Sequence, residues 1–289
     1  MKEKVLITGP TGSTGTDAVK RLLELHIPVR ALVHRIDDRS EQLARLGAEL
    51  VQGDLLDFNS VSTALKGINR AYFVYDIKVP GIVEATGYFS QAAVEEGLTH
   101  VVNMSQISAR KDAASHAAQN HWISERMLDN TGITVTHLRP TYFAEWLMYL
   151  SAEIRENNRI VMPFADVRYA PIADEDIGRV VAAILANPKG HERKSYQLYG
   201  AVEVSQYEIA EILSEQLGRK ITYIPVTIAA FAEVLKSNFT PYFVQHISGV
   251  AQDCLDGIFS GMNDLVEKIS GQQPLSMADY IRGNIGLFR

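Results

Sequence analysis

The stretch LITGPTGSTG, residues 6–15, contains three glycines, Gly9, Gly12 and Gly15, at intervals of three. It follows a short β-branched run and opens a segment with the apolar spacing of a helix. Glycine permits the tight turn from strand to helix, lets the backbone approach a diphosphate and allows close packing of helix on strand, while the amides at a helix start attract negative charge. The stretch therefore predicts a dinucleotide-binding turn, and the alternative interpretation is a purely structural turn.

The chain continues to alternate between short apolar runs and segments with helical spacing. Six runs rich in β-branched residues predict strands. They are KVLITG (4–9), VRALVH (29–34), ELVQGD (49–54), AYFVYD (71–76), HVVNMS (100–105) and TVTHLRP (134–140). Several are almost wholly apolar, as expected of strands covered on both faces. We therefore expect an α/β protein with a parallel sheet and right-handed crossovers.

The alternation becomes less regular after residue 140. The pattern predicts a helix near 141–157, a strand at 160–162, a helix near 174–187, a strand at 195–199 and then helices to the end. Ser205 and Glu208 predict a capping box at the start of one of these helices. Because no linker is recognisable, this part is expected to pack directly on the sheet.

Composition disfavours several classes of protein. The formal charge of -6, from 28 basic and 34 acidic residues, argues against direct binding of nucleic acid. No apolar run reaches the length of a membrane span, and the N-terminus lacks a signal-peptide pattern. Cys254 is the single cysteine, so neither a disulfide nor a zinc pattern is expected. We expect a cytoplasmic protein without a metal.

The residues after the second predicted strand favour NADP(H) over NAD(H). Proteins that bind NAD usually place Asp or Glu there, about 20 residues after the glycines, to bind the ribose 2′-hydroxyl. This chain has His34 and Arg35 at that place, and Asp37 and Asp38 follow too late. A guanidinium at position 35 can bind a 2′-phosphate through charge-assisted hydrogen bonds. NAD(H) is the alternative if Arg35 is only a solvated loop charge.

Other candidate contacts to the dinucleotide follow from the strand ends, because ligands of open α/β sheets lie outside the carboxyl ends of the strands. Asp54 can accept from the adenine amino group, or it can instead cap a turn. The hydroxyls beside the glycines can add hydrogen bonds. The expected contacts are Gly9, Thr11, Gly12, Ser13, Thr14, Gly15, His34, Arg35, Asp54, Leu55, Val74, Tyr75, Met104 and Ser105.

Together these motifs resemble the atypical short-chain dehydrogenases/reductases, and among them the NmrA-like family. The motifs are TGPTGSTG (8–15), GDL (53–55), NMS (103–105) and LRP (138–140), with Glu125 on a helix between the last two. The resemblance covers nearly the whole chain. This family includes triphenylmethane dye reductases, NADPH quinone oxidoreductases and a regulatory protein.

The resemblance implies a Rossmann-type doubly wound sheet with a small, mainly helical C-terminal substrate lobe. The NAD(P)-binding domain is expected over residues 1–155. Residues 156–289 are expected to complete the sheet and form the lobe, interleaved with the first domain.

The helix predicted within SHAAQNHWISER (115–126) lacks two residues that the wider superfamily carries there. In that superfamily a tyrosine protonates a carbonyl oxygen and a lysine holds the ribose. Counted back from Glu125, the lysine position falls at His121 and the tyrosine position at Ala117. Ordinary ketone chemistry and sugar epimerisation are therefore in doubt. His116 and His121 lie about 140° apart around a helix, so they do not converge on a metal.

Hydride transfer to a conjugated acceptor does not require that acid, because a quinone, azo compound or dye spreads the incoming electron pair over its rings. His121 and Ser105 are the candidate catalytic residues. His121 can bind the nicotinamide ribose or relay a proton with a pKa near neutrality. The alternative for His121 is a partly exposed residue without a role.

A flat acceptor needs an aromatic slot. The candidates are Tyr75, Gln106, Tyr142, Phe143, Trp146, Phe239 and Tyr242, with Phe243 in a possible lid, although such aromatics are more often core. The run YFAEWLMYL (142–150) also has the pattern of an amphipathic helix that can bury against a second subunit. We therefore expect an NAD(P)H-dependent reductase of a small conjugated acceptor. The alternative is a non-catalytic NAD(P) sensor that binds a regulatory protein partner.

Overall fold

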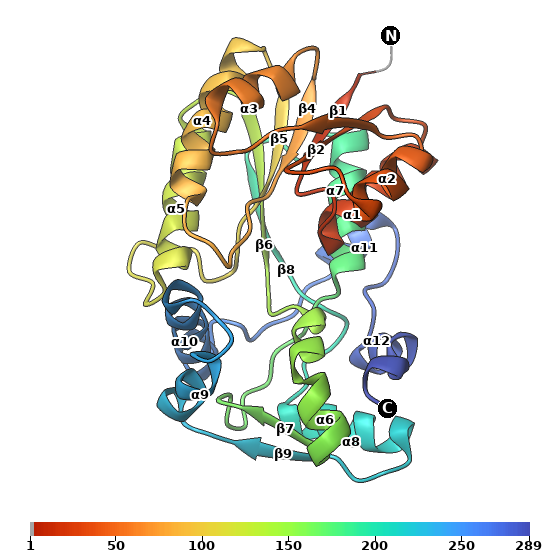
Figure 1. Ribbon diagram of the computed structural model, residues 1–289, viewed down its shortest axis with the longest axis vertical. Coiled ribbons are helices and arrows are strands. Elements are labelled where there is room, and N and C mark those ends of the chain that lie inside the picture. Colours follow the sequence, from red (N-terminus) through yellow and green to blue (C-terminus); the bar gives the residue numbers. More distant parts are fainter. Residues whose placement is uncertain (1–2) are drawn as a thin grey trace.

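The computed structural model describes residues 3–289 and contains a seven-stranded sheet (Figure 1). Its strands are β1 (Val5–Thr8), β2 (Val29–Val33), β3 (Glu49–Gln52), β4 (Arg70–Phe73), β5 (His100–Met104), β6 (Thr134–Pro140) and β8 (Lys194–Leu198). The order is β3-β2-β1-β4-β5-β6-β8, and every neighbouring pair is parallel. All six strands predicted before residue 141 are confirmed.

Helices cover both faces of this sheet. On one face lie α1 (Ser13–Glu24), α7 (Asp174–Ala186) and α11 (Leu265–Ser270), with α2 (Asp38–Arg45) beside them; on the other lie α3 (Phe58–Leu65), α4 (Ile82–Glu95) and α5 (His116–Asp129). Side chains alternate between the faces, so Val5 and Ile7 pack under α1 and α7 while Leu6 packs under α3 and α4. The predicted doubly wound parallel sheet is confirmed.

The remaining elements form a lobe beyond the carboxyl ends of the strands (Figure 1). They are the 3₁₀ helix η1 (Ala144–Leu150), α6 (Ser151–Asn157), β7 (Arg159–Met162), α8 (Gln206–Leu217), β9 (Thr222–Pro225), α9 (Ile228–Leu235), α10 (Pro241–Leu255), α12 (Met277–Gly283) and η2 (Ile285–Leu287). The expectation of helices alone after residue 199 is wrong, because β9 pairs in parallel with β7. That partner lies far earlier in the chain, so local pattern does not reveal it.

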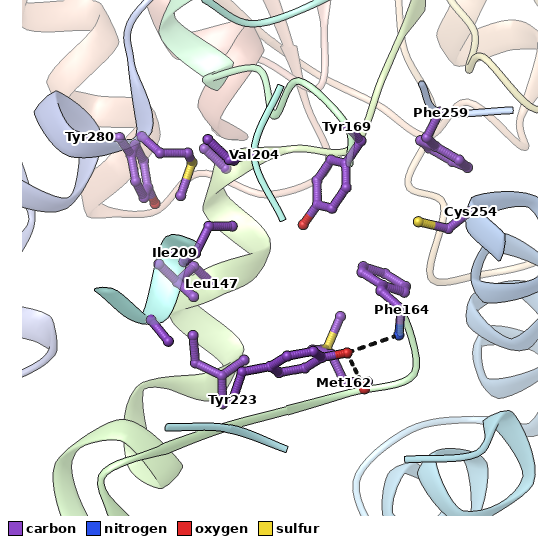
Figure 2. Close-up of a cluster of buried hydrophobic side chains, with 14 of the residues drawn as sticks. Leu147, Met162, Phe164, Tyr169, Val204, Ile209, Tyr223, Cys254, Phe259 and Tyr280 are labelled. Atoms are coloured by element: carbon purple, nitrogen blue, oxygen red, sulfur yellow. Dashed lines mark hydrogen bonds between the residues drawn. The ribbon is translucent and has the colours of Figure 1, made fainter. Parts of the chain in front are cut away.

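A separate hydrophobic core fills the lobe (Figure 2). Tyr223 of β9 reaches across to β7, where its hydroxyl donates to the Met162 carbonyl at 2.9 Å and accepts from the Phe164 amide at 3.3 Å. A buried tyrosine whose polar end is hydrogen-bonded adds apolar contact area without leaving a polar group unsatisfied. This residue therefore ties the two-stranded sheet to the aromatic core.

The helix predicted over 141–157 begins later than expected. Tyr142 and Phe143 are extended, because the Ile172 amide donates to the Tyr142 carbonyl at 3.0 Å and the Ala144 amide donates back to Ile172 at 2.9 Å. The 3₁₀ helix that follows has three residues per turn, and it buries Ala144 and Leu147 on one face. A pairing with a distant segment has overridden the local helical pattern.

The C-terminal part contributes to the sheet layers as well as to the lobe, since β8, α7 and α11 all follow residue 155. The predicted capping box is confirmed: Ser205 Oγ accepts from the Glu208 amide at 3.3 Å, and the Glu208 carboxylate accepts from the Ser205 amide at 2.7 Å. None of the helices within residues 3–289 combines the length and apolar character needed to cross a membrane.

Candidate functional site

The order of strands reverses between β1 and β4, and open α/β sheets bind ligands outside the carboxyl ends at such a reversal. Thr8 at the end of β1 joins the two strands there. Its hydroxyl donates to the Val74 carbonyl at 2.9 Å and accepts from the Val74 amide at 2.8 Å. The glycine-rich loop follows Thr8 directly, so the fold places this loop at the reversal.

Packing within the protein requires glycine at two of the three glycine positions of the loop. Gly9 has a φ of +55°, and a Cβ there would lie 2.9 Å from Val74 Cγ1. A Cβ on Gly15 would overlap the Gly9 carbonyl oxygen. A Cβ on Gly12 would meet only that same oxygen, at an ordinary 3.4 Å. The internal packing therefore demands Gly9 and Gly15, whereas at Gly12 it leaves open space for an external group.

The start of α1 is prepared for a negative charge. Gly12 is its N-cap and supplies no side-chain acceptor, and no acidic residue stands in the first turn. The first amides of a helix have no intrahelical acceptor and carry the positive end of the helix dipole. With the open space at Gly12, these donors fit the diphosphate of a dinucleotide.

Two of the three hydroxyls expected to bind that diphosphate have partners inside the protein. The Ser13 hydroxyl donates to the carboxylate of Asp174, the first residue of α7. The Thr14 hydroxyl lies 3.0 Å from that of Tyr72, and both residues are buried. Thr11 is half-buried. The Thr14 hydroxyl therefore serves the packing of α1 on β4.

Arg35 is exposed just beyond β2, and its guanidinium has no ion-pair partner within residues 3–289. The neighbouring His34 is also exposed, with Nε2 3.6 Å from Asp54 Oδ2. Nothing within the described chain therefore competes for the Arg35 guanidinium at the place where a 2′-phosphate is expected.

Asp37, the nearest carboxylate, has a structural role. It is the N-cap of α2 and accepts from the Arg39 and Ser40 amides, both at 3.1 Å, while the Arg39 side chain adds a bond at 3.0 Å. The Arg39 side-chain bond, followed by the Ser40 amide, lowers the pKa of Asp37. This carboxylate stabilises the helix start.

Asp54 caps a turn, which was the alternative to a contact with adenine: its Oδ1 accepts from the Leu56 amide at 2.9 Å. Leu55 and Val74 are half-buried beside the same strand ends and pack on the sheet core. The hydroxyl of half-buried Tyr75 donates to the Pro80 carbonyl at 3.0 Å.

Ser105 lies next to a buried ion pair at the end of β5. Glu125 on α5 accepts from Arg139 Nε at 2.8 Å, and a second guanidinium nitrogen bonds its other oxygen. Burial raises the pKa of Glu125, but the Arg139 and Ser105 side chains outweigh burial and lower it. The buried Ser105 hydroxyl lies near Glu125 but has no hydrogen-bond partner of normal geometry within residues 3–289, while the neighbouring Met104 is buried in the sheet core.

His121 is more buried than the sequence suggested, with 4% of its surface exposed. Burial lowers its pKa to about 4, although the charge of Glu125 opposes the shift. The proton relay with a pKa near neutrality and the alternative of a partly exposed residue are both wrong, because folding buries the His121 ring. His121 Nδ1 and Gln106 Nε2 have no hydrogen-bond partner within residues 3–289. The residue at the tyrosine position, Ala117, is fully buried.

Helix α10 of the lobe docks on the start of α5. His246 Nδ1 is 2.8 Å from Ser115 Oγ, the N-cap of α5, and Gln245 Oε1 accepts from the His116 amide at 3.0 Å. A Cβ on Gly249 would lie 2.7 Å from the Ser115 nitrogen, so glycine permits this close approach. Sequence reasoning missed His246, because a histidine within an apolar helix gives no local signal of its partner. His116, by contrast, has an exposed side chain. Residues 3–289 contain no group of three or more His, Cys, Asp or Glu side chains that could hold a metal ion.

The aromatic residues expected to form a slot pack mainly on each other. The Tyr142 ring contacts Trp146 and Phe164, and Trp146 stacks on Phe243 at 5.7 Å between ring centres. Phe239 packs on Phe243 at 5.0 Å. Phe143 instead packs against the sheet core. A cavity of about 20 Å³ beside Tyr142 has room for one water molecule. These side chains fill the lobe core.

Tyr75 and Tyr242 remain as half-buried aromatic candidates from two different parts of the fold. Tyr75 follows β4, and Tyr242 stands in the first turn of α10. Burial raises the pKa of Tyr75, and the nearby Asp54, Asp76 and Tyr242 raise it further. The two tyrosines are therefore close in space, one from the sheet edge and one from the lobe.

Known proteins similar to this chain share its length and fold. An NAD(P)H azoreductase from Xenophilus azovorans is 25% identical over 287 residues, 98% of this chain and 99% of that protein. The structure of an NADPH-dependent quinone oxidoreductase from Escherichia coli complexed with NADPH matches 97% of this chain and 99% of its own, with a TM-score of 0.88 and 23% identity. The Citrobacter sp. triphenylmethane reductase complexed with NADP(H) matches 96% and 99%, with a TM-score of 0.85 and 22% identity. The model of the NmrA-like family matches residues 1–256, and the chain therefore belongs to the NmrA-like family, as its motifs predicted.

Proposed function

We propose that this protein is an NADPH-dependent reductase that transfers hydride to a small conjugated acceptor, such as a quinone, an azo compound or a dye-like aromatic. The observation that carries the proposal is the loop at residues 9–15, whose middle glycine faces open space beside the uncapped start of α1. The similar azoreductase and the two similar reductases in complex with NADPH or NADP(H) support the same class of activity.

Each part of the site has a task in this proposal. The amides of α1 hold the diphosphate, and the free guanidinium of Arg35 binds the 2′-phosphate. His121 Nδ1, buried without a partner, is the candidate contact to the nicotinamide ribose. The bound dinucleotide supplies the hydride. Tyr75 and Tyr242 are the candidates for contact with a flat acceptor.

A conjugated acceptor is favoured because α5 has no tyrosine acid to protonate a simple ketone. Ala117 cannot donate a proton, and His121 is neutral at physiological pH because burial lowers its pKa. An alkoxide formed from a simple ketone would have no acid beside it. A conjugated acceptor delocalises the added electron pair and can take its proton later from water, so orientation supplies most of the catalysis.

The activity can be tested by mixing the purified protein with NADPH and a panel of quinones, azo dyes and triarylmethane dyes. The absorbance of reduced nicotinamide should fall only when an acceptor is present. Simple ketones of similar size serve as the control and should give no turnover. Tight NADPH binding without oxidation by any acceptor would contradict the reductase and favour the alternative, an NAD(P) sensor with a protein partner. The alanine at position 117, where the superfamily has its tyrosine acid, is the observation that favours this alternative.

His121→Ala should weaken cofactor binding or slow turnover about 5- to 30-fold, the effect of one lost buried hydrogen bond. Because burial lowers the pKa of His121 to about 4, the ring stays neutral above about pH 5, and the pH profile of kcat should show no step near neutrality that depends on this residue. His116→Ala, an exposed change on the same helix, is the matched control. Unchanged kinetics in His121→Ala would assign this residue to packing alone.

A further inference from the structure

Two buried carboxyl groups lie next to the loop that we propose binds the diphosphate. Asp174, at the start of α7, accepts the hydrogen bond from Ser13, and Glu145 of η1 faces Asp174 closely enough that each changes the pKa of the other. Asp174 Oδ1 and Glu145 Oε2 are buried and have no hydrogen-bond partner within residues 3–289. Neither carboxyl forms an ion pair in that part of the chain. The loop that we propose binds a diphosphate therefore lies next to two buried carboxyl groups that have no positively charged partner within residues 3–289.

The surroundings of Asp174 and Glu145 favour the protonated form of these carboxyl groups. Burial raises the pKa of both carboxyls, and the charge of Asp174 raises that of Glu145 further. Hydrogen bonds from Ser13 and from protonated Glu145 lower the pKa of Asp174, and the positive end of α7 also favours its ionised form, so Glu145 holds the proton more strongly.

The groups facing the pair provide no positive charge. Asp17 of α1 raises the pKa of Asp174. From α12, the Tyr280 hydroxyl is buried without a hydrogen-bond partner, and from β4 the Tyr72 hydroxyl bonds Thr14. Both tyrosines are neutral, because burial raises the pKa of each well above its usual value. An incoming diphosphate therefore adds negative charge beside Asp174, which has no ion-pair partner within residues 3–289, while Lys20, Arg21 and Arg179 act on the neighbouring Asp17.

We propose that binding of the dinucleotide diphosphate is coupled to the uptake of one proton by Asp174, with Ser13 as the link. In the free protein the ionised Asp174 accepts the Ser13 O–H. When the diphosphate binds, Asp174 takes a proton from solvent and donates it in a hydrogen bond to Ser13 Oγ. The Ser13 O–H then turns to a phosphate oxygen. One proton enters, one negative charge disappears from the pair, and no covalent bond in the cofactor changes.

This coupling, which rests on the proposed cofactor site, sets the pH dependence of binding. Cofactor raises the pKa of Asp174 above its value in the free protein, so affinity is highest when Asp174 is already protonated. As pH rises between the two pKa values, Kd should increase by up to about tenfold per pH unit. At a pH above both pKa values, Asp174 is ionised in the free and in the cofactor-bound protein, and Kd no longer depends on pH.

The experiment is calorimetric titration of NADPH into wild type, Asp174→Asn and Glu175→Gln in buffers of different ionisation enthalpy, which yields the number of protons taken up. Asp174→Asn keeps a donor for Ser13 Oγ but cannot titrate, so it should lose the uptake seen in wild type and bind more tightly at high pH. Glu175→Gln removes one charge from the same helical turn at an exposed residue, and it should behave like wild type. The NADPH 2′-phosphate also titrates, near pH 6, but equally in all three proteins.

Equal proton uptake in wild type and Asp174→Asn, with NADPH bound by both, would overturn the coupling and leave the proposed function standing. Failure of wild type to bind either nicotinamide dinucleotide would overturn both. If Asp174→Asn does not fold, infrared difference spectra of the wild type with and without NADPH decide the question. A new protonated-carboxyl band on binding is the expected result, and its absence contradicts the proposal.

Discussion

Gly12→Val is expected to weaken NADPH binding at least 100-fold, a loss of about 2.7 kcal/mol or more, while the protein stays folded. A Cβ at this position meets only the Gly9 carbonyl oxygen, at an ordinary van der Waals distance of 3.4 Å, so we expect the protein to accommodate the substitution. The added methyl groups occupy the space in front of the first amides of α1, where the diphosphate must lie. Calorimetry gives the affinity, and thermal denaturation should show at most the cost of a poorer N-cap, about 1 kcal/mol.

Gly15→Ala is the matched comparison in the same loop. Its Cβ would overlap the Gly9 carbonyl and come within 2.9 Å of Pro10 Cα, so it should destabilise the fold by about 1–3 kcal/mol. The two variants thus separate a glycine needed by a ligand from one needed by packing. NADPH binding of wild-type strength in folded Gly12→Val would contradict the assignment of the loop.

Arg35→Ala should weaken NADPH binding about 10- to 100-fold and leave NADH binding nearly unchanged. The exposed guanidinium has no ion-pair partner within residues 3–289, so its removal costs the fold little and removes only the contact to a 2′-phosphate. A charge-assisted contact of this kind contributes about 1.5–3 kcal/mol. Parallel titrations with both nucleotides measure the ratio of affinities.

Arg39→Ala is the control for Arg35→Ala, because it tests whether the loss of any positive charge near this site weakens NADPH binding. It removes the same charge from the nearby start of α2, but Arg39 already pairs with Asp37 at 3.0 Å. It should therefore leave the preference for NADPH close to that of wild type. Equal losses of NADPH and NADH affinity in Arg35→Ala would show that position 35 does not distinguish the two nucleotides.

The sheet and the glycine-rich turn were predictable because their signals are local. A buried parallel strand is a run of apolar residues, and the turn needs glycines at fixed intervals within ten residues. All eight predicted strands formed, and the family expected from the motifs is confirmed. The role proposed for Arg35 likewise rests on its distance from the glycines, and it stays a prediction.

The errors arose where a residue's surroundings come from distant parts of the chain. His121 was expected to relay a proton with a pKa near neutrality, but burial lowers its pKa to about 4, and α10 docks on the same helix through Gly249 and His246. Tyr142 and Trp146 suggested a slot, yet the lobe packs them against each other. No local pattern reports such contacts.

The sequence by itself determined the layered fold, the glycine-rich turn and the basic group at the end of the second strand, because each depends on residues close together in the chain. Only the tertiary structure decided the protonation state of His121 and the meeting of Ser13 with Asp174 and Glu145. Those properties depend on burial and on charges brought together by folding, and the low dielectric of the interior makes them strong.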